Sequence, residues 1–310
     1  MGNQPITALP WLLFLAPVYG GAALLIREFA RRYNKGWPTI ILLGVAFSLF
    51  FEGIVDQMFY NPSYLDLASF EGYALIPGLG ASGSLIQASL MTHTIWSMCV
   101  PIMLIEAFDS QPLRPWLGRV GTLLVTMVFL LGSVAATAVQ YEEFDFFISP
   151  LQLLLTGGVV LLACIVAFRL KKNTKRVPGI TIPSARQLSV WSFTALSIYW
   201  IQSWFLVGTN EFLAWISILV WLMIVTFLTV RLIRWTRSEA WTDLHSFALI
   251  TGAVLCYCWT GFIQGFFRFG LSPIVIFGNF IFAGCTIWLL IIASQKLRER
   301  ASRPGSLAQN

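Results

Sequence analysis

The sequence has very little charge and almost no histidine. Asp, Glu, Lys and Arg make up 11% of its 310 residues, and there are 2 histidines, whereas soluble proteins carry about 25% charged residues. This scarcity excludes a soluble enzyme and a nucleic-acid-binding protein. The 5 cysteines all fall within apolar runs, which excludes a disulfide scaffold. We expect them to be small core residues.

Long apolar runs are what the sequence has in abundance. Hydrophobic residues make up 57% of the chain, aromatic residues 15%, and the mean hydropathy is +0.75. The runs exceed about 18 residues, the length of a membrane-spanning helix, whereas strands of a membrane barrel are about ten residues long. We therefore predict an all-α, polytopic helical membrane bundle that forms one domain over residues 1–310.

We predict nine transmembrane helices, a long external loop or lid at 60–84, and a cytoplasmic tail at 296–310. The predicted spans lie near 9–30, 38–59, 85–107, 118–140, 150–169, 188–208, 212–233, 243–264 and 272–295. Short cytoplasmic loops retain Lys and Arg, and with nine spans 19 of the 20 basic residues fall on one side. Those residues are Arg27, Arg31, Arg32, Lys35, Arg114, Arg119, Arg169, Lys171, Lys172, Lys175, Arg176, Arg186, Arg231, Arg234, Arg237, Lys296, Arg298, Arg300 and Arg303.

The opposite connections are acidic. They carry Asp66, Glu71, Glu142, Glu143, Asp145 and Glu211, with Arg268 as their only basic residue. This segregation predicts an external N-terminus and a cytoplasmic C-terminus. It also predicts contact between the cytoplasmic loops and the head groups of anionic lipids.

Ionisable side chains within the predicted spans are the first candidates for function, because burying them in a membrane is costly. At 1.5 Å per residue, Glu52 lies roughly 10 Å below the outer surface and His93 roughly 12 Å below it. Asp56 is one helical turn above Glu52 on the same face. Because consecutive antiparallel helices are often neighbours, we expect Glu52 and His93 to be in contact.

Further polar residues fall in the outer half of the spans and suggest an outward-facing pocket under the 60–84 loop. The candidates are Gln57, Gln87, Gln202 and Asn279, together with Arg268 at the outer surface. Their ligand would be an unknown small solute or protons. On the inner side, Glu106 lies near Asp109, and Glu239, Asp243 and His245 open the eighth span, where helix capping is the better interpretation. We expect no metal site and no cofactor.

The first third of the chain resembles a family of uncharacterised bacterial polytopic membrane proteins. The similar motifs are Gly20-Gly21, Arg27-Glu28, Gly36-Trp37-Pro38-Thr39, Phe51-Glu52-Gly53, Asp56-Gln57, Asn61-Pro62, His93-Thr94, Trp96-Ser97 and Pro101. The resemblance implies a bacterial cytoplasmic membrane and brings no activity with it.

A fainter likeness is to the CAAX-type intramembrane proteases, whose pattern is Glu-Glu-x-x-x-Arg, then Phe-x-x-x-His, then a further His. This sequence departs from that pattern, since Phe51-Glu52 replaces the acidic pair, Asp56 stands in place of the Arg, and Ser89 precedes His93 in place of the Phe. The later His245 falls on the opposite side of the predicted membrane.

Three functions remain open from the sequence. The first is a small-solute or proton-linked transporter or sensor built on Glu52, Asp56 and His93. The second is an intramembrane hydrolase or transferase in which Glu52 activates water and His93 assists. The third is a membrane subunit whose polar residues only pack helices or bind a protein partner.

Overall fold

The computed structural model describes residues 6–171 and 176–302. Lys172, Lys175 and Arg303, which we predict on the cytoplasmic side, lie outside the described residues. Residues 304–310 of the predicted tail lie outside them as well.

Almost all of the described chain is helical. Nine long helical rods follow one another in this part of the chain if the segments that continue directly into each other are counted together. The rods are α1 (Trp11–Arg32); α2 (Trp37–Phe50) with η2 (Phe51–Val55); α3 (Gly83–Met91) with η4 (Thr92–Cys99) and α4 (Val100–Phe108); α5 (Arg119–Phe144); α6 (Pro150–Arg169); α7 (Ala185–Leu206); α8 (Glu211–Trp235); α9 (Asp243–Phe269); and α10 (Pro273–Ala301).

Among the described residues, 8 of these rods are long and apolar enough to cross a membrane, by length and composition. The other is α7, which has 22 residues but a more polar composition that includes four serines and two glutamines. The chain is therefore a polytopic helical membrane protein. The nine spans and their direction across the membrane remain predictions.

Two helix ends that differ from the predicted span ends have identifiable causes. The second span ends at Val55 and not near residue 59, because Gln57 adopts a positive φ of 59° that no helix continues through. The predicted tail from 296 is helical as far as Ala301. Lys296 and Glu299 pair across one turn at 3.2 Å, and Arg300 donates to the carbonyl oxygen of Asp109 at 2.8 Å, so α10 remains anchored beyond its apolar stretch.

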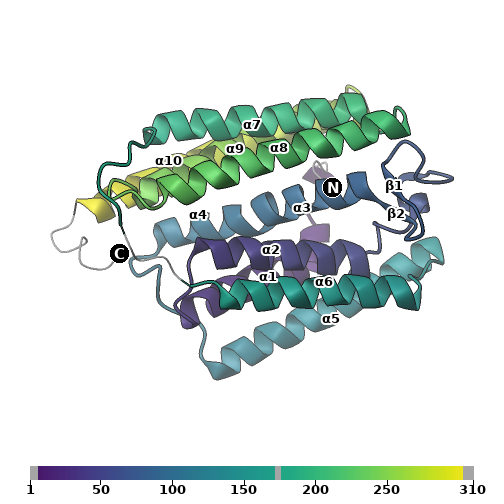
Figure 1. Cartoon of the computed structure of the whole chain (residues 1–310), viewed down its shortest axis with the longest axis horizontal. Helices are drawn as coiled ribbons and strands as arrows, with labels where there is room; N and C mark the ends of the chain where they lie inside the picture. Colours follow the sequence, from purple (N-terminus) through teal and green to yellow (C-terminus); the bar gives the residue numbers. More distant parts are fainter. Residues whose placement is uncertain (1–5, 172–175, 303–310) are drawn as a thin grey trace.

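The rods lie side by side in two groups (Figure 1). Helices α1, α2, α5 and α6 form one group, α7 to α10 form the other, and the α3–η4–α4 rod runs between them. Of the apolar stretch of α2, 61% is buried, against 6% of that of α5. Helix α2 is therefore a central helix, and α5 presents its apolar side chains outward, as a lipid-facing helix does.

Helices α7 and α9 approach each other closely. A Cβ atom at Gly252 would lie 2.2 Å from the carbonyl oxygen of Ser189, so only glycine fits there. Ser189 and Ser192 donate hydrogen bonds to the carbonyl oxygens of Ala248 and Leu249, at 2.8 Å and 2.7 Å. Small residues and interhelical serine bonds are the usual means of joining helices in membranes.

The two ends of the bundle differ in character. At the basic end, formed by the connections 33–36, 109–118, 176–184 and 236–242, Lys35 donates to the carbonyl oxygens of Phe168 and Leu170. At the opposite end the 60–84 loop forms a compact cap with the 3-10 helix η3 (Pro62–Leu65) and a hairpin of β1 (Leu75–Ile76) and β2 (Ala81–Ser82). The amide of Gly72 in this cap donates to Glu211 at 2.9 Å.

The five cysteines are free, and they do not share one environment. Cys99 and Cys256 are buried and Cys164 and Cys258 are half-buried, whereas Cys285 is exposed. The expectation of a core position is therefore wrong for Cys285, which lies on an outward face of α10.

Candidate functional site

Glu52 and His93 are in direct contact within the bundle. Nε2 of His93 lies 2.5 Å from Oε1 of Glu52, and the two residues are 2% and 6% exposed. The contact expected from their common depth is therefore present. It joins the α2–η2 rod to the α3–η4–α4 rod.

Both residues lie in π-helical segments. Glu52 belongs to η2, in which the amide of Asp56 donates to the carbonyl oxygen of Phe51, five residues back, at 2.7 Å. His93 belongs to η4, an eight-residue π-helix that ends just before Pro101 of α4. Proline has no amide hydrogen and displaces the preceding turn. π-Helical turns are rare and occur frequently at functional sites, so two of them facing each other mark this site.

The imidazole of His93 is bonded at both nitrogens and enclosed by aromatic rings. Its Nδ1 lies 3.1 Å from the hydroxyl of Ser97, one turn further along η4. The ring centroid of Tyr19 is 5.4 Å away, and those of Phe47 and Phe51 are about as close. A neutral imidazole has one donor and one acceptor nitrogen, so it can link Ser97 and Glu52 in a single hydrogen-bonded chain.

Asp56 and Tyr64 extend this chain toward the cap. The Asp56 carboxyl group lies close to that of Glu52, and the Tyr64 hydroxyl lies close to Asp56. Burial, together with the charges of Asp56 and Glu52, raises the pKa of Tyr64 well above its ordinary value, so its hydroxyl stays protonated and can donate to a nearby carboxylate. Glu52 Oε2 and Asp56 Oδ2 have no hydrogen-bond donor among the described residues. Two facing carboxyl groups form a hydrogen bond only when one of them carries a proton.

Two glutamines predicted as site residues are buried near this chain but face other partners. The Gln57 side-chain oxygen accepts a hydrogen bond from the amide of Ile148 at 2.8 Å. Gln87 lies close to the hydroxyl of Tyr199 on α7. These contacts join Gln57 to the segment before α6 and Gln87 to the α7 group.

The structure does not bring the remaining predicted residues together with Glu52. Gln202 donates to the carbonyl oxygen of Tyr199 on its own helix, and Asn279 reaches the carbonyl oxygen of Gly261 on α9 at 3.4 Å. Arg268 is exposed and lies over the ring of Phe269 at 5.5 Å. The site in this structure is the group of Tyr64, Asp56, Glu52, His93 and Ser97, which we call the outer polar chain; Asp56, Glu52 and His93 are buried, and Tyr64 and Ser97 are half-buried.

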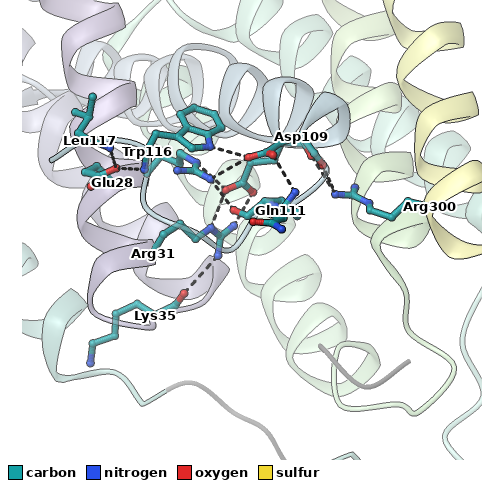
Figure 2. A network of polar contacts seen from close by, with 11 residues as sticks. Glu28, Arg31, Lys35, Asp109, Gln111, Trp116, Leu117 and Arg300 are labelled. Atoms are coloured by element: carbon teal, nitrogen blue, oxygen red, sulfur yellow. Dashed lines mark hydrogen bonds and ion pairs between the residues drawn. The ribbon is translucent and has the colours of Figure 1, made fainter. Parts of the chain in front are cut away.

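A second buried polar network at the basic end was not predicted in full from the sequence (Figure 2). Arg31 donates to both carboxylate oxygens of Glu106, at 2.7 Å and 2.6 Å, and Arg27 donates to the same carboxylate at 3.1 Å. Arg27 is 1% exposed and its guanidinium lies 3.4 Å from the ring centroid of Trp116. The positive-inside pattern accounts for these arginines without requiring an acidic partner for them. The sequence therefore contains no signal that they are buried.

Glu28 and Asp109 hold the 109–118 connection onto this network (Figure 2). Glu28 is fully buried and accepts hydrogen bonds from the amides of Trp116 and Leu117, at 2.8 Å and 3.1 Å. Asp109 accepts from the Trp116 indole at 2.6 Å. Partial burial acts to raise the pKa of Asp109, but the Gln111 amide, the Trp116 indole and the charges of Arg27 and Arg300 outweigh it and lower the pKa below its ordinary value.

Two of the inner-side candidates, Asp243 and His245, lie in the first turn of α9 as expected for helix capping, whereas Glu239 precedes the helix and Glu106 belongs to the arginine network. His245 Nδ1 lies 2.8 Å from the Thr242 hydroxyl and accepts from the Thr242 amide at 3.1 Å, which caps the first turn of α9. Asp243 approaches Arg300 at 4.0 Å. Within the described ranges 6–171 and 176–302, no group of three or more His, Cys, Asp or Glu side chains is arranged to hold a metal ion.

Comparison with known proteins agrees with this class of fold. A family model described as "Uncharacterized membrane protein family" matches residues 2–293. The chain belongs to this family, and the match extends well beyond the first third in which the resemblance was recognised. No curated protein and no solved structure matches the chain.

Proposed function

We propose that the protein is a proton-linked membrane protein, a transporter of a small solute or a sensor, in which the outer polar chain takes up and releases a proton. The observation that carries this proposal is the 2.5 Å hydrogen bond between Glu52 and His93 in the buried centre of the bundle. Ionisable groups at this depth are typical of proton relays in membrane proteins.

The order of the groups supports a relay. Tyr64 is half-buried in the cap and lies close to Asp56, which adjoins Glu52. Glu52 bonds to His93, and His93 bonds to Ser97. Each of these five groups can either give or accept a proton or hydrogen bond. These groups follow one another from the cap into the bundle, which is the order that a proton relay requires.

The π-helical segments supply a way to couple the proton to movement. A π-helical turn holds one residue more than an α-helical turn, so conversion of η2 or η4 to α-helix rotates its side chains about the helix axis. Protonation of Glu52 removes the charge that orients His93 and releases the constraint between the two rods. The chain would act in the cytoplasmic membrane of a bacterium, with the basic end of the bundle inside and the cap outside.

The test uses the small number of histidines. The chain has 2 histidines, so ¹⁵N-histidine labelling of a His245→Gln variant leaves a single NMR probe at His93. We expect the ¹⁵N signals of the His93 ring to change with pH, and Glu52→Gln to alter that pH dependence. The control Glu142→Gln, which substitutes an exposed outer carboxylate, should leave it unchanged.

A second measurement reads the activity itself. Proteoliposomes loaded with a pH-sensitive dye should take up protons after acidification of the outside, and Glu52→Gln should abolish this uptake while the variant remains folded. Equal uptake in the parent and in Glu52→Gln, or no uptake by either above that of protein-free liposomes, would overturn proton transport. If the His93 signals are also unaffected by Glu52→Gln, the sensor is overturned as well, and a helix-packing or partner-binding subunit is favoured.

A further inference from the structure

Helices α7 and α8 enclose an apolar groove of about 380 Å³. Its walls include Trp191, Ile198 and Phe227, and Thr194 is the only lining residue with a polar side chain. The rings of Trp191 and Phe227 stack at a centroid distance of 6.4 Å, although both side chains are largely exposed. The groove lies within two helices that we place in the membrane, so its surroundings are lipid.

A second cavity of about 320 Å³ adjoins the groove at the start of α7. Trp191 lines both cavities, and the second one is also lined by Thr181, Gln187 and Trp235. This second cavity therefore combines polar and aromatic side chains at the basic end of the bundle. Both volumes fall in the range typical of small-molecule sites, about 300–1,000 Å³.

Two arginines stand beside the pair of cavities. The guanidinium of Arg231 lies 5.2 Å from the ring centroid of Phe227, and Arg231 is one turn before Trp235 on α8. Arg186 is the neighbour of Gln187 and lies one turn before Val190, which lines the groove. Both arginines are exposed, and among the described residues neither forms an ion pair.

The first turn of α7 adds to the positive potential at this place. Ser184 caps the helix by accepting a hydrogen bond from the amide of Gln187 at 3.3 Å. The second cavity lies beside this helix start and is lined by Thr181, Ile182 and Pro183 before it and by Gln187 in its first turn. The N-terminus of a helix carries a partial positive charge that favours anions.

We propose that the α7–α8 groove and the adjoining cavity form a binding site for one anionic phospholipid. An acyl chain lies in the apolar groove, and the phosphate group lies between Arg186 and Arg231 next to the start of α7. Basic pockets between transmembrane helices at the cytoplasmic side bind anionic lipid head groups in this way. The arginines and the polar cavity identify the occupant as an anionic lipid, because an apolar helix of a partner would leave them unused.

The first test is native mass spectrometry of the full chain in detergent with two added lipids, dioleoyl phosphatidylglycerol and dioleoyl phosphatidylcholine. We expect the parent to retain the anionic lipid preferentially, and Arg186→Gln with Arg231→Gln to reduce that preference by about fivefold for each arginine. The matched control is Arg119→Gln with Arg298→Gln, which removes the same charge from two exposed arginines. A preference that survives in the first double variant, or that falls equally in the control, would overturn the head-group assignment.

A second variant tests the groove without changing charge. Ala195 lines the groove, so Ala195→Phe fills it, whereas Ala138→Phe adds the same ring to an exposed position on α5. We expect Ala195→Phe to reduce retention of the anionic lipid and Ala138→Phe to leave it unchanged. Unchanged retention in Ala195→Phe contradicts the proposal. A dimeric parent and a monomeric Ala195→Phe variant would also contradict the proposal, because the groove would then be an interface with a second copy of the chain.

Discussion

The guanidinium of Arg31 holds the carboxylate of Glu106 through two parallel hydrogen bonds, at 2.7 Å and 2.6 Å, although both residues lie within the bundle. Such a bidentate pair fixes α1 against α4 in one register. Arg27 shares the same carboxylate and lies 3.8 Å from the carboxylate of Asp109, so Glu106 is the acidic group that contacts both buried cations. The basic end of the bundle therefore depends on Glu106 more than on any one of the arginines.

Substitution Glu106→Gln should destabilise the folded protein by about 3–5 kcal/mol, because it leaves the buried Arg31 without its counter-charge and Arg27 with only the longer pair to Asp109. Thermal unfolding in detergent would measure this loss. The control is Glu299→Gln, which breaks the exposed pair with Lys296 and should cost less than about 1 kcal/mol. Similar unfolding temperatures for the two variants would show that the Glu106 network contributes little.

Substitution Gly252→Ala should separate α7 from α9. The added Cβ would meet the Ser189 carbonyl oxygen at 2.2 Å and the backbone nitrogen of Phe193 at 2.8 Å, and backbone atoms cannot rotate away. We expect a loss of about 3 kcal/mol or more of folding free energy. Gly284→Ala on α10 is the matched control, since no atom lies within 4 Å of its Cβ position, and it should keep the stability of the parent or improve on it.

Asp109 should make the stability of the basic end depend on acid pH. Its pKa is lower in the folded protein than in the unfolded chain, where an aspartate titrates near about 3.9. Its contribution is therefore present above that value and is lost as the pH falls through the lower, folded pKa. Asp109→Asn should be less stable than the parent at neutral pH and should approach it in acid. Parallel stability curves from pH 7 to about pH 2 would refute this, because the loss falls below the unfolded pKa.

Tyr64→Phe should interrupt the outer polar chain at its entrance and leave the inner part intact. The phenylalanine keeps the ring contact with Phe144, whose centroid lies 5.5 Å away, but it removes the hydroxyl that lies close to Asp56. Proton uptake by proteoliposomes should slow by about 100-fold, in line with the loss of one positioned proton-transfer group. The ¹⁵N signals of His93 should stay close to those of the parent, and undiminished uptake would remove Tyr64 from the relay.

Some of this molecule could be predicted from simple periodicity and depth. The rise of 1.5 Å per residue placed Glu52 and His93 at one level, and their contact is present at 2.5 Å. The π-helical segments could not be predicted, because their extra residue leaves no pattern in an apolar run, and only Pro101 hints at a disturbed turn. Tyr64 was missed because a loop residue reaches the site only once the cap has folded.

The basic end shows a different limit of sequence reasoning. Arg27 and Arg31 satisfy the rule that cytoplasmic loops are basic, so nothing in the sequence required a partner for them. Their burial depends on the path of the 109–118 connection, which brings Trp116 over Arg27 at 3.4 Å and presents its amides to Glu28. Connections of this kind are determined by tertiary contacts and have no periodic signal.

The polar composition of α7 has a consequence for how the chain is made. The helix is not among those that composition alone suits to a membrane, and two of its serines bond to backbone oxygens of α9. During synthesis α7 leaves the ribosome two helices before that partner exists. We expect α7 to insert stably into the bilayer only once α9 has been translated. A nascent chain halted after α8 should therefore leave the α7 region open to chemical labelling from the aqueous side. A nascent chain extended through α9 should protect the same region.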